Sequence, residues 1–357
     1  MRDGTQELLR EWNGLGVVQG FDAETGTWMF IALHDATLGM MVGGCRMKTY
    51  PTPGDAMRDA MRLGEGMTYK WAAIDFPFGG GKSVLAIPRP LNDEEKRGLI
   101  GRFGRLLESL NGAYATGVDL GTTPEDMDVL AEASQYVMGH GVSGSGTEDP
   151  GPYTALGVFA GIRSALAALD GSPDLEGLSV LIQGAGDVGE PLARMLAEAG
   201  ATVLLSDIDE GKALRLAKEL GGRAVAVTDT YSTPCDLFAP CAVGAILSAK
   251  TIPQLDCRIV AGSANNQLDR PEDAELLHEL GILYAPDYVV NGGGAIAFGM
   301  MHLGETDEEA VLERVRRIES ALDRIFAEAA QRGESPVHGA RRVAEDALRR
   351  GREKEHV

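Results

Sequence analysis

This sequence predicts an α/β fold divided into two domains, and three observations support that prediction. The 357 residues are more than one hydrophobic core usually holds, so two domains are expected. The first third mixes strand and helix patterns, whereas the chain beyond residue 150 alternates strands and helices regularly. Regular alternation is typical of a parallel sheet covered by helices. We therefore expect an N-terminal α/β domain followed by a Rossmann-type domain.

The N-terminal elements follow from apolar spacing and turn residues. Residues 17–21 and 27–33 have strand patterns with a turn between them, and Thr52 and Pro53 are typical of a helix start. That helix places Lys70 near its far end. The remaining elements expected here are a strand at 83–87 after three glycines, a helix beginning at Asn92 or Asp93, a strand ending at Asp119, and a helix beginning at Thr123.

The second half begins after a segment rich in glycine and serine, 139–152, whose composition is expected of an interdomain hinge. A helix to about Leu169 and strands near 178–183, 201–207, 235–239 and 257–261 form a βαβ series. The C-terminal part is predicted as helix: one opening at Thr306 with Glu309 as capping-box partner and ending near Gly333, and another beginning at Ser335. We expect domains at 1–140 and 141–334.

Composition and charge restrict the class of partner. With 33 basic and 53 acidic side chains the net charge is −20, so nucleic acid and anionic membrane surfaces would be repelled. The four cysteines show no metal-binding spacing, and the N-terminus does not resemble a secretory signal. We expect a reduced, cytoplasmic protein without a structural metal, whose partner is a small molecule or another copy of the chain.

Two lysines, Lys70 and Lys82, stand out because only 8 of the 33 basic residues are lysine. A desolvated lysine can lose its proton and act as a base, which arginine cannot do. Lys82 follows a glycine run that suits close approach of the backbone to a ligand. The alternative is a lysine whose stem lies along apolar surface with its ammonium in water. A P-loop is excluded because its first glycine would fall on Phe76.

A nucleotide site is predicted at 179–189. The strand 179–183 leads into Gly184, Gly186 and Gly189, and a helical pattern follows. In this fingerprint the first glycine makes the turn, the second admits the pyrophosphate, and the third allows close packing of helix and strand. Asp207, at the end of the next strand, would bind ribose hydroxyls, so NAD is expected over NADP. The alternative is a glycine-rich turn without a nucleotide.

The whole set of motifs resembles the glutamate/leucine/phenylalanine/valine dehydrogenase family, closest to its phenylalanine and leucine branch. The resemblance covers nearly the whole chain and rests on segments 42–47, 66–70, 79–82, 119–123, 184–189, 238–242, 261–266 and 285–288. It implies an N-terminal substrate and catalytic domain, a Rossmann NAD domain, C-terminal helices returning to the first domain with helix 335–357 packing on it, and a homo-oligomer.

The resemblance also implies roles for individual residues. Lys70, the backbone of Gly43 and Gly44, and Asn266 would hold the substrate carboxylate. Lys82, its pKa lowered beside Lys70, would activate water, and Asp119 would exchange protons with the amino nitrogen. The cofactor would contact Gly184, Gly186, Asp187, Val188, Gly189, Asp207, Ile208, Cys241, Ala242 and Asn291. Asp119 could alternatively be a charge at a helix N-terminus, and Asn266 a loop residue that satisfies backbone groups.

Specificity is expected from three pocket residues, Val42, Gly117 and Ala295. Gly117 and Ala295 resemble the phenylalanine branch, which implies NAD-dependent reversible oxidative deamination of phenylalanine or another bulky apolar L-amino acid to the 2-oxo acid and ammonia. The segment 298–302 matches neither branch. The alternatives are a leucine or valine dehydrogenase, a tryptophan-acting relative, and a nonenzymatic NAD-binding sensor.

Overall fold

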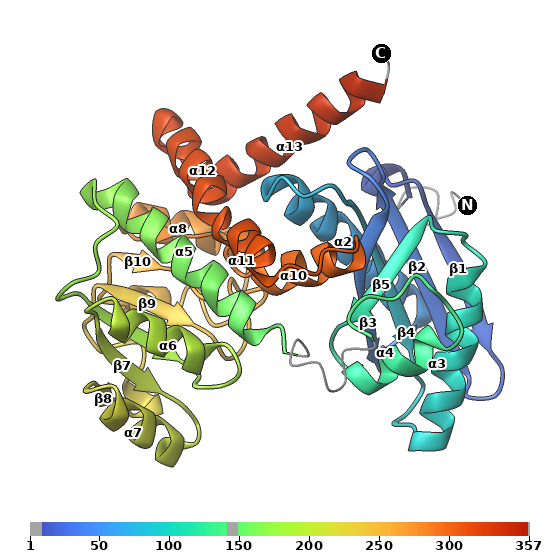
Figure 1. Ribbon diagram of the computed structural model, residues 1–357, viewed down its shortest axis with the longest axis horizontal. Helices are drawn as coiled ribbons and strands as arrows, with labels where there is room; N and C mark the ends of the chain where they lie inside the picture. Colours follow the sequence, from blue (N-terminus) through green and yellow to red (C-terminus); the bar gives the residue numbers. More distant parts are fainter. Residues whose placement is uncertain (1–8, 141–148, 356–357) are drawn as a thin grey trace. The chain divides into compact units, whose positions relative to one another are not determined.

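The computed structural model describes residues 9–140 and 149–355. The chain divides into two compact units: unit 1 comprises residues 1–148 and 344–357, and unit 2 comprises residues 149–343. Each unit has its own sheet (Figure 1). The hinge predicted at 139–152 falls mostly on 141–148, outside the described residues, and Gly151 already belongs to a helix.

Unit 1 is built on a five-stranded mixed sheet of order β1-β2-β4-β3-β5. β2 pairs antiparallel with β1 and β4, whereas β3 pairs parallel with β4 and β5. Its elements are β1 Gly16–Asp22, β2 Thr27–Asp35, β3 Met41–Lys48, α2 Pro53–Ala73, β4 Gly79–Ala86, α3 Asp93–Glu108, β5 Tyr114–Val118 and α4 Pro124–Ala131.

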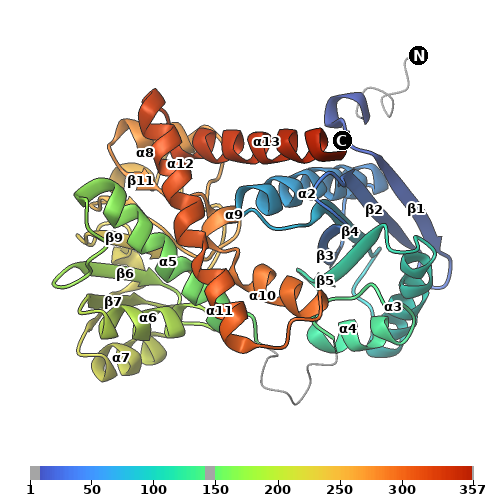
Figure 2. The same ribbon diagram turned by 45° about the horizontal axis from the view of Figure 1, so that its top comes forward.

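Helix α2 covers one face of this sheet, lying along β2 and β4 (Figure 2). The apolar side chains beneath it include Phe30, Ala60 and Val84, whereas the opposite face carries a separate cluster around Phe103 and Leu107 of α3. The predicted starts of α2, α3 and α4 are confirmed: Thr52, Asn92 and Thr123 are N-caps whose side chains accept from backbone amides, and α3 and α4 have complete capping boxes.

The three glycines before Lys82 are part of β4, so the predicted start of this strand at Ser83 was wrong. A Cβ on Gly80 would collide with the Thr68 backbone and side chain in α2, and one on Gly81 would lie 2.8 Å from the Tyr114 ring. Gly80 therefore allows helix α2 to pack closely on the sheet, and Gly81 leaves room for the Tyr114 ring. This is a structural reason different from the ligand approach inferred from the sequence.

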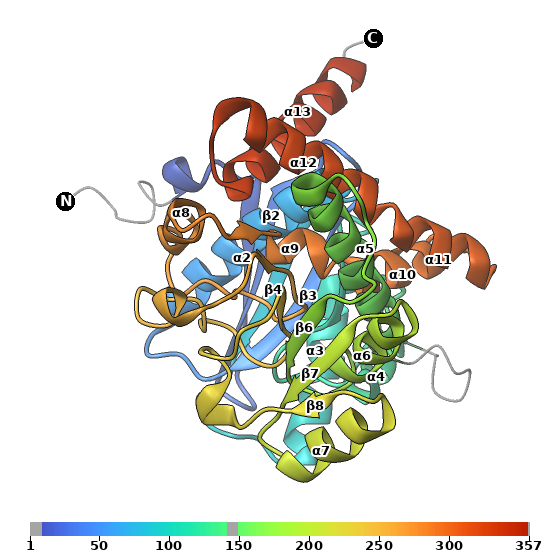
Figure 3. The same ribbon diagram turned by 90° about the vertical axis from the view of Figure 1, so that its left-hand side faces the viewer.

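Unit 2 contains a six-stranded parallel sheet of order β11-β10-β9-β6-β7-β8. In sequence order within the unit this is the 3-2-1-4-5-6 arrangement of dinucleotide-binding folds, so the Rossmann prediction is confirmed. Its first elements are α5 Gly151–Asp170, β6 Ser179–Gln183, α6 Gly189–Glu198, β7 Thr202–Ser206, α7 Glu210–Glu219, β8 Arg223–Ala224, β9 Leu237–Pro240 and β10 Ile259–Val260. Helices α6 and α7 contact β6, β7 and β8 (Figure 3).

The chain continues with α8 Asp273–Glu279, β11 Leu283–Tyr284, α9 Asp287–Val290, α10 Gly293–His302, α11 Glu308–Arg316, α12 Ile318–Arg332 and α13 Pro336–Glu355. One helix was predicted from Thr306 to Gly333. The structure has two, because the chain turns at Arg317, and the first is capped by Asp307, whose side chain accepts from Glu309 N. Gly333 ends α12 in the left-handed conformation, as expected. The last part of α13, from Ala344, groups with unit 1.

Helix α5 has the length and mean hydropathy, 1.2, of a membrane-spanning helix, but 56% of that stretch is buried inside the protein. It packs against α6, α10, α11 and α12. Gly157 and Gly161 of α5 face Val290, whose side chain leaves no room for a Cβ at Gly161. The apolar composition of α5 is therefore that of a core helix in unit 2.

Candidate active site

Lys82 and Asp119 form an ion pair in unit 1. The Nζ of Lys82, in β4, lies 3.2 Å from Oδ1 of Asp119, which follows β5, and the Lys82 residue is 5% exposed. Thr122 fixes the Asp119 backbone, since its hydroxyl accepts from Asp119 N and lies 2.9 Å from Cys45 O. Gly121 has φ +85°, and a Cβ there would collide with Met47 O, so the turn after Asp119 requires glycine.

Arg46 is the second cation at this carboxylate. Its Nε donates to Asp119 Oδ2 at 2.9 Å, so each oxygen of Asp119 has its own basic partner. Burial lowers the pKa of Lys82, an effect that Asp119 opposes and Arg46 reinforces. Burial alone would raise the pKa of Asp119, but Lys82 and Arg46 outweigh it and the pKa lies below its ordinary value. The Lys82 ammonium therefore loses its proton more readily than an exposed lysine does, beside a carboxylate that stays ionised.

The residues around the pair lie on one face of the sheet. Gly44 of β3 is in register with Gly117 of β5, and a Cβ on Gly44 would lie 2.7 Å from Asp119 Cβ and 3.1 Å from Lys82 Nζ. Val42, two residues earlier on the same face, is buried. A Cβ on Gly117 would meet only Met138, at 3.5 Å from its carbonyl oxygen and 3.6 Å from its Cβ. The structure therefore brings Lys82, Asp119, Gly44, Gly117 and Val42 together.

Gly43 has a buried polar support beneath it. Its carbonyl oxygen accepts from the Tyr114 hydroxyl at 2.9 Å and from the Thr116 hydroxyl at 3.1 Å, and Ser83 joins the same cluster. A Cβ on Gly43 would collide with Gly81 O. These contacts fix the orientation of the Gly43–Gly44 peptide, whose backbone was predicted to bind the substrate carboxylate.

Lys70 is half-buried in the last turn of α2. Two neighbours place this end of the helix against the start of β3: Trp71 Nε1 donates to Val42 O at 3.1 Å, and Met67 lies next to Gly43. Lys70 follows Met67 by three residues and therefore lies on the same side of the helix. This places Lys70 on the helix face that runs past Val42 and Gly43.

The three fingerprint glycines of unit 2 have three different environments. Gly184 has φ +97° and makes the turn, and a Cβ on Gly189 would collide with Gly184 O. A Cβ on Gly186 would meet nothing within 4 Å. Val188 is the N-cap position of α6, so the helix N-terminus follows directly. An exposed turn with an open second glycine and a helix N-terminus fits a bound pyrophosphate.

Asp207 has a structural task that sequence reasoning missed. Its Oδ2 accepts from Ala185 N at 2.7 Å, inside the fingerprint turn, and its Oδ1 accepts from Asp209 N at 2.8 Å. A carboxylate offers about four lone-pair positions. Both oxygens therefore retain acceptor capacity for ribose hydroxyls while holding the turn.

The other predicted residues of unit 2 lie on loops and on α10. Asp187 and Ala242 are exposed, Ile208 is 93% exposed, and Cys241 N donates to Gln183 O. Asn291 is buried, and its side-chain amide donates to Asn265 Oδ1 at 2.6 Å. Asn266 is exposed with φ +53°, and its carbonyl accepts from Ala245 N at 2.7 Å, whereas Ala295 is half-buried in α10.

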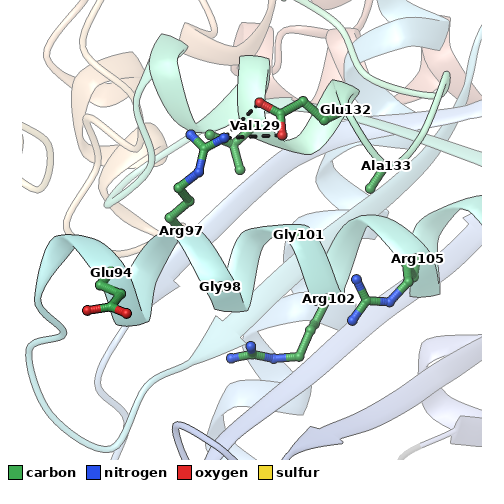
Figure 4. A pocket seen from close by; sticks show the side chains of 9 residues that line it. All are labelled: Glu94, Arg97, Gly98, Gly101, Arg102, Arg105, Val129, Glu132 and Ala133. Carbon is green, nitrogen blue, oxygen red and sulfur yellow. Dashed lines mark hydrogen bonds and ion pairs between the residues drawn. The ribbon is translucent and has the colours of Figure 1, made fainter.

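A surface hollow of unit 1 lies between α3 and α4 (Figure 4). Arg97 there donates to both oxygens of Glu132, and Arg102 pairs with Asp22 and Glu24. None of the residues predicted from the sequence lines it. Within the described ranges, no three His, Cys, Asp or Glu side chains are grouped to hold a metal ion.

A parallel sheet in Rossmann order with this fingerprint defines the class of dinucleotide-binding proteins. Comparison with known proteins narrows the class. Residues 22–136 match the Glu/Leu/Phe/Val dehydrogenase dimerisation domain, and residues 205–354 match the Glutamate/Leucine/Phenylalanine/Valine dehydrogenase domain. The chain is 41% identical to a leucine dehydrogenase of Geobacillus stearothermophilus (92% of this chain, 88% of the relative). It is 40% identical to a phenylalanine dehydrogenase of Lysinibacillus sphaericus (92% and 86%).

The crystal structure of L-tryptophan dehydrogenase from Nostoc punctiforme superposes with a TM-score of 0.88 at 37% identity, covering 98% of this chain and 99% of that one. The chain belongs to the Glu/Leu/Phe/Val dehydrogenase family. It is an NAD-dependent amino-acid dehydrogenase, so the predicted enzyme class and cofactor are confirmed.

Proposed function

We propose that this enzyme catalyses the reversible oxidative deamination of a bulky apolar L-amino acid, with phenylalanine preferred. One L-amino acid, one water and NAD⁺ would give the 2-oxo acid, ammonium, NADH and a proton. The observation that carries the proposal is the buried Lys82–Asp119 pair in front of two glycines, Gly44 and Gly117. A nonenzymatic NAD sensor would have no use for such a pair.

In this proposal, different residues of the chain bind the cofactor, transfer protons and bind the substrate. Bound NAD would supply the hydride acceptor, held at the fingerprint residues and at Asp207, Ile208, Cys241, Ala242 and Asn291. Lys82 in its neutral form would take a proton from the water that attacks the imino carbon, and Asp119 would exchange protons with the departing nitrogen. Lys70 and the fixed Gly43–Gly44 peptide would bind the carboxylate. Asn266 and Ala295, from unit 2, are further proposed substrate contacts.

The relatives carry three different substrate names at similar identity, so they do not indicate one substrate. The preference is therefore proposed from the two small pocket residues, Gly117 and Ala295. We expect NADH formation at alkaline pH to be fastest with phenylalanine in a panel that includes tryptophan, leucine, valine and alanine. Each additional buried CH₂ contributes about 0.8 kcal/mol. Discrimination of ~10 to 200-fold per methylene leaves room for leucine activity.

Filling the pocket should shift this preference. A Cβ at Gly117 would make only ordinary contacts with Met138, so we expect Gly117→Ala combined with Ala295→Val to fold and to favour leucine over phenylalanine. Gly66→Ala is the matched control, because a Cβ there meets nothing within 4 Å. Faster turnover of valine than of phenylalanine by the parent enzyme would contradict the proposal.

Cofactor choice gives a separate prediction. We expect a higher kcat/KM with NAD than with NADP, because Asp207 would repel a 2′-phosphate and accept from ribose hydroxyls. Steady-state kinetics with both cofactors measure this. Equal efficiency would mean that Asp207 serves only the backbone of the fingerprint turn.

We further propose that the enzyme is a cytoplasmic homo-oligomer. The match of residues 22–136 to a domain described as a dimerisation domain supports self-association. The four cysteines, all free, are consistent with a reducing compartment.

A further inference from the structure

Arg46 connects the Lys82–Asp119 pair to helix α2 through a second carboxylate. Its Nε donates to Asp119 Oδ2 at 2.9 Å, and its Nη1 donates to Asp59 Oδ2 at 3.2 Å. The arginine and Asp59 side chains are each 14% exposed. The result is a row of alternating charge, Lys82, Asp119, Arg46 and Asp59, that runs from β4 across β5 and β3 to α2.

Asp59 is itself held in place. The Tyr50 hydroxyl donates to Asp59 Oδ2 at 2.7 Å, and Arg62 donates to its Oδ1 at 2.8 Å. Asp59 therefore has fixed partners on both oxygens and offers Arg46 a stationary anchor. A planar guanidinium with two anchored nitrogens has little freedom to rotate, whereas a lysine ammonium on a flexible stem would not be constrained in this way.

We propose that Arg46 is a positioning residue that holds the Asp119 carboxylate by Oδ2, so that Oδ1 stays beside Lys82 Nζ for proton exchange. The inference rests on the roles proposed above for Lys82 and Asp119. Its geometric basis is the division of the two Asp119 oxygens between two different cations, at 2.9 and 3.2 Å. Arg46 does not touch the substrate in this scheme, and it acts through Asp119.

The simpler alternative is that Arg46 only ties β3 to α2. Removal of one partner from a mostly buried ion pair destabilises a protein whatever its catalytic role. A loss of stability therefore does not distinguish the two ideas, but a shift in the pH profile does. Arg46 lowers the pKa of both Lys82 and Asp119, so its removal should raise both.

The direction of that shift can be stated. In deamination the active form has neutral Lys82, so activity rises with pH through the pKa of Lys82. We call this rising part of the pH–activity profile the acid limb. Loss of Arg46 should move the acid limb to higher pH. The titratable and charged groups around the pair come from β3, the segment after β3, and α2: Cys45 and Arg46, Tyr50, and Asp59 and Lys70. Arg46→Gln removes a charge that lowers the pKa of both Lys82 and Asp119.

The experiment compares Arg46→Gln and Arg46→Lys with the parent enzyme, using L-phenylalanine, L-leucine and NAD over a range of pH. We expect kcat of Arg46→Gln to fall by about 10²-fold, the scale associated with a misplaced catalytic group, with a smaller change in KM. The acid limb should move to higher pH. Arg46→Lys keeps the positive charge, so its acid limb should lie at the same pH as in the parent enzyme. Its kcat should recover only in part.

Two further variants keep the test decisive. Asp59→Asn leaves Arg46 in place but weakens its anchor, and should lower kcat by less than Arg46→Gln does. Arg58→Gln removes an exposed arginine that pairs with Asp55 on the same helix. It should leave both kcat and the pH of the acid limb unchanged. If Arg46→Gln folds and keeps the parent pH profile, or loses stability with kcat within about twofold, the inference is wrong.

A measurement without substrate separates this inference from the proposed function. The ¹³C signal of the Asp119 carboxyl, assigned by its absence in Asp119→Asn, should titrate at higher pH in Arg46→Gln than in the parent. An unchanged titration overturns the positioning role even if the enzyme is active. A shifted titration in a protein that deaminates none of the amino acids would instead contradict the proposed function.

Discussion

Lys82→Met should reduce turnover by at least ~10²-fold while leaving NAD binding unchanged, because a positioned acid or base contributes about that factor. Methionine has a similar length and tolerates apolar surroundings, so it should fit the buried site that the lysine occupies. Asp119 would keep Arg46 as a partner and would not be left as an unpaired charge. Single-turnover kinetics, together with NAD binding measured by fluorescence or calorimetry, would separate chemistry from cofactor binding.

Lys96→Met is the matched control for this variant. Lys96 also pairs with a carboxylate, at 2.6 Å from Asp126 Oδ2, and it belongs to the same unit, but it lies on α3 outside the candidate site. We expect turnover of Lys96→Met close to that of the parent. If Lys82→Met turned over at the parent rate, Lys82 would have no part in the mechanism.

Asp119→Asn should cause a loss of similar size, because an amide cannot exchange the proton that the amino nitrogen requires. The variant also makes a prediction about pH. Asp119 raises the pKa of Lys82 against the effect of burial, so its neutralisation should lower that pKa further. The acid limb of any residual activity should therefore move to lower pH, the opposite of the shift expected for Arg46→Gln.

Residual activity measured between about pH 7 and 11, a range that spans the ordinary lysine pKa, would test this sign. Asp126→Asn is a suitable control, since Asp126 is also an acid paired with a lysine in unit 1. A limb that moved to higher pH in Asp119→Asn would contradict the assignment of the limb to Lys82. Full activity in that variant would exclude Asp119 as the proton carrier.

Local signals explain the parts of the fold that the sequence predicted well. Thr52, Asn92 and Thr123 are side-chain caps, and such caps depend on residues three positions apart. The fingerprint glycines likewise act within six residues. The two-residue strands β8 and β11 were missed because so short a segment has no period, and their existence depends on neighbours in the sheet.

The candidate site was predicted less completely because its main contacts join distant residues. Lys82 and Asp119 were selected from motifs. Arg46 pairs with Asp119, which is 73 positions away, and no local sequence pattern predicts that contact. Met138, which faces Gly117, was missed for the same reason. Strand β3, Met41–Lys48, was not predicted either, so the sequence reasoning did not show that Gly44 and Arg46 lie on the same face of the sheet.

Close contacts within the sheet and between the sheet and α2 determine where the pocket can be redesigned. At Gly43 and Gly80 an added methyl group would strike backbone atoms, and at Gly44 it would press on Asp119 and Lys82. At Gly117 the same methyl group would make ordinary van der Waals contact. Directed evolution for new substrates should therefore accumulate changes at 117 and in the adjoining Met138, while libraries that vary 43, 44 or 80 should return mostly unfolded or inactive clones.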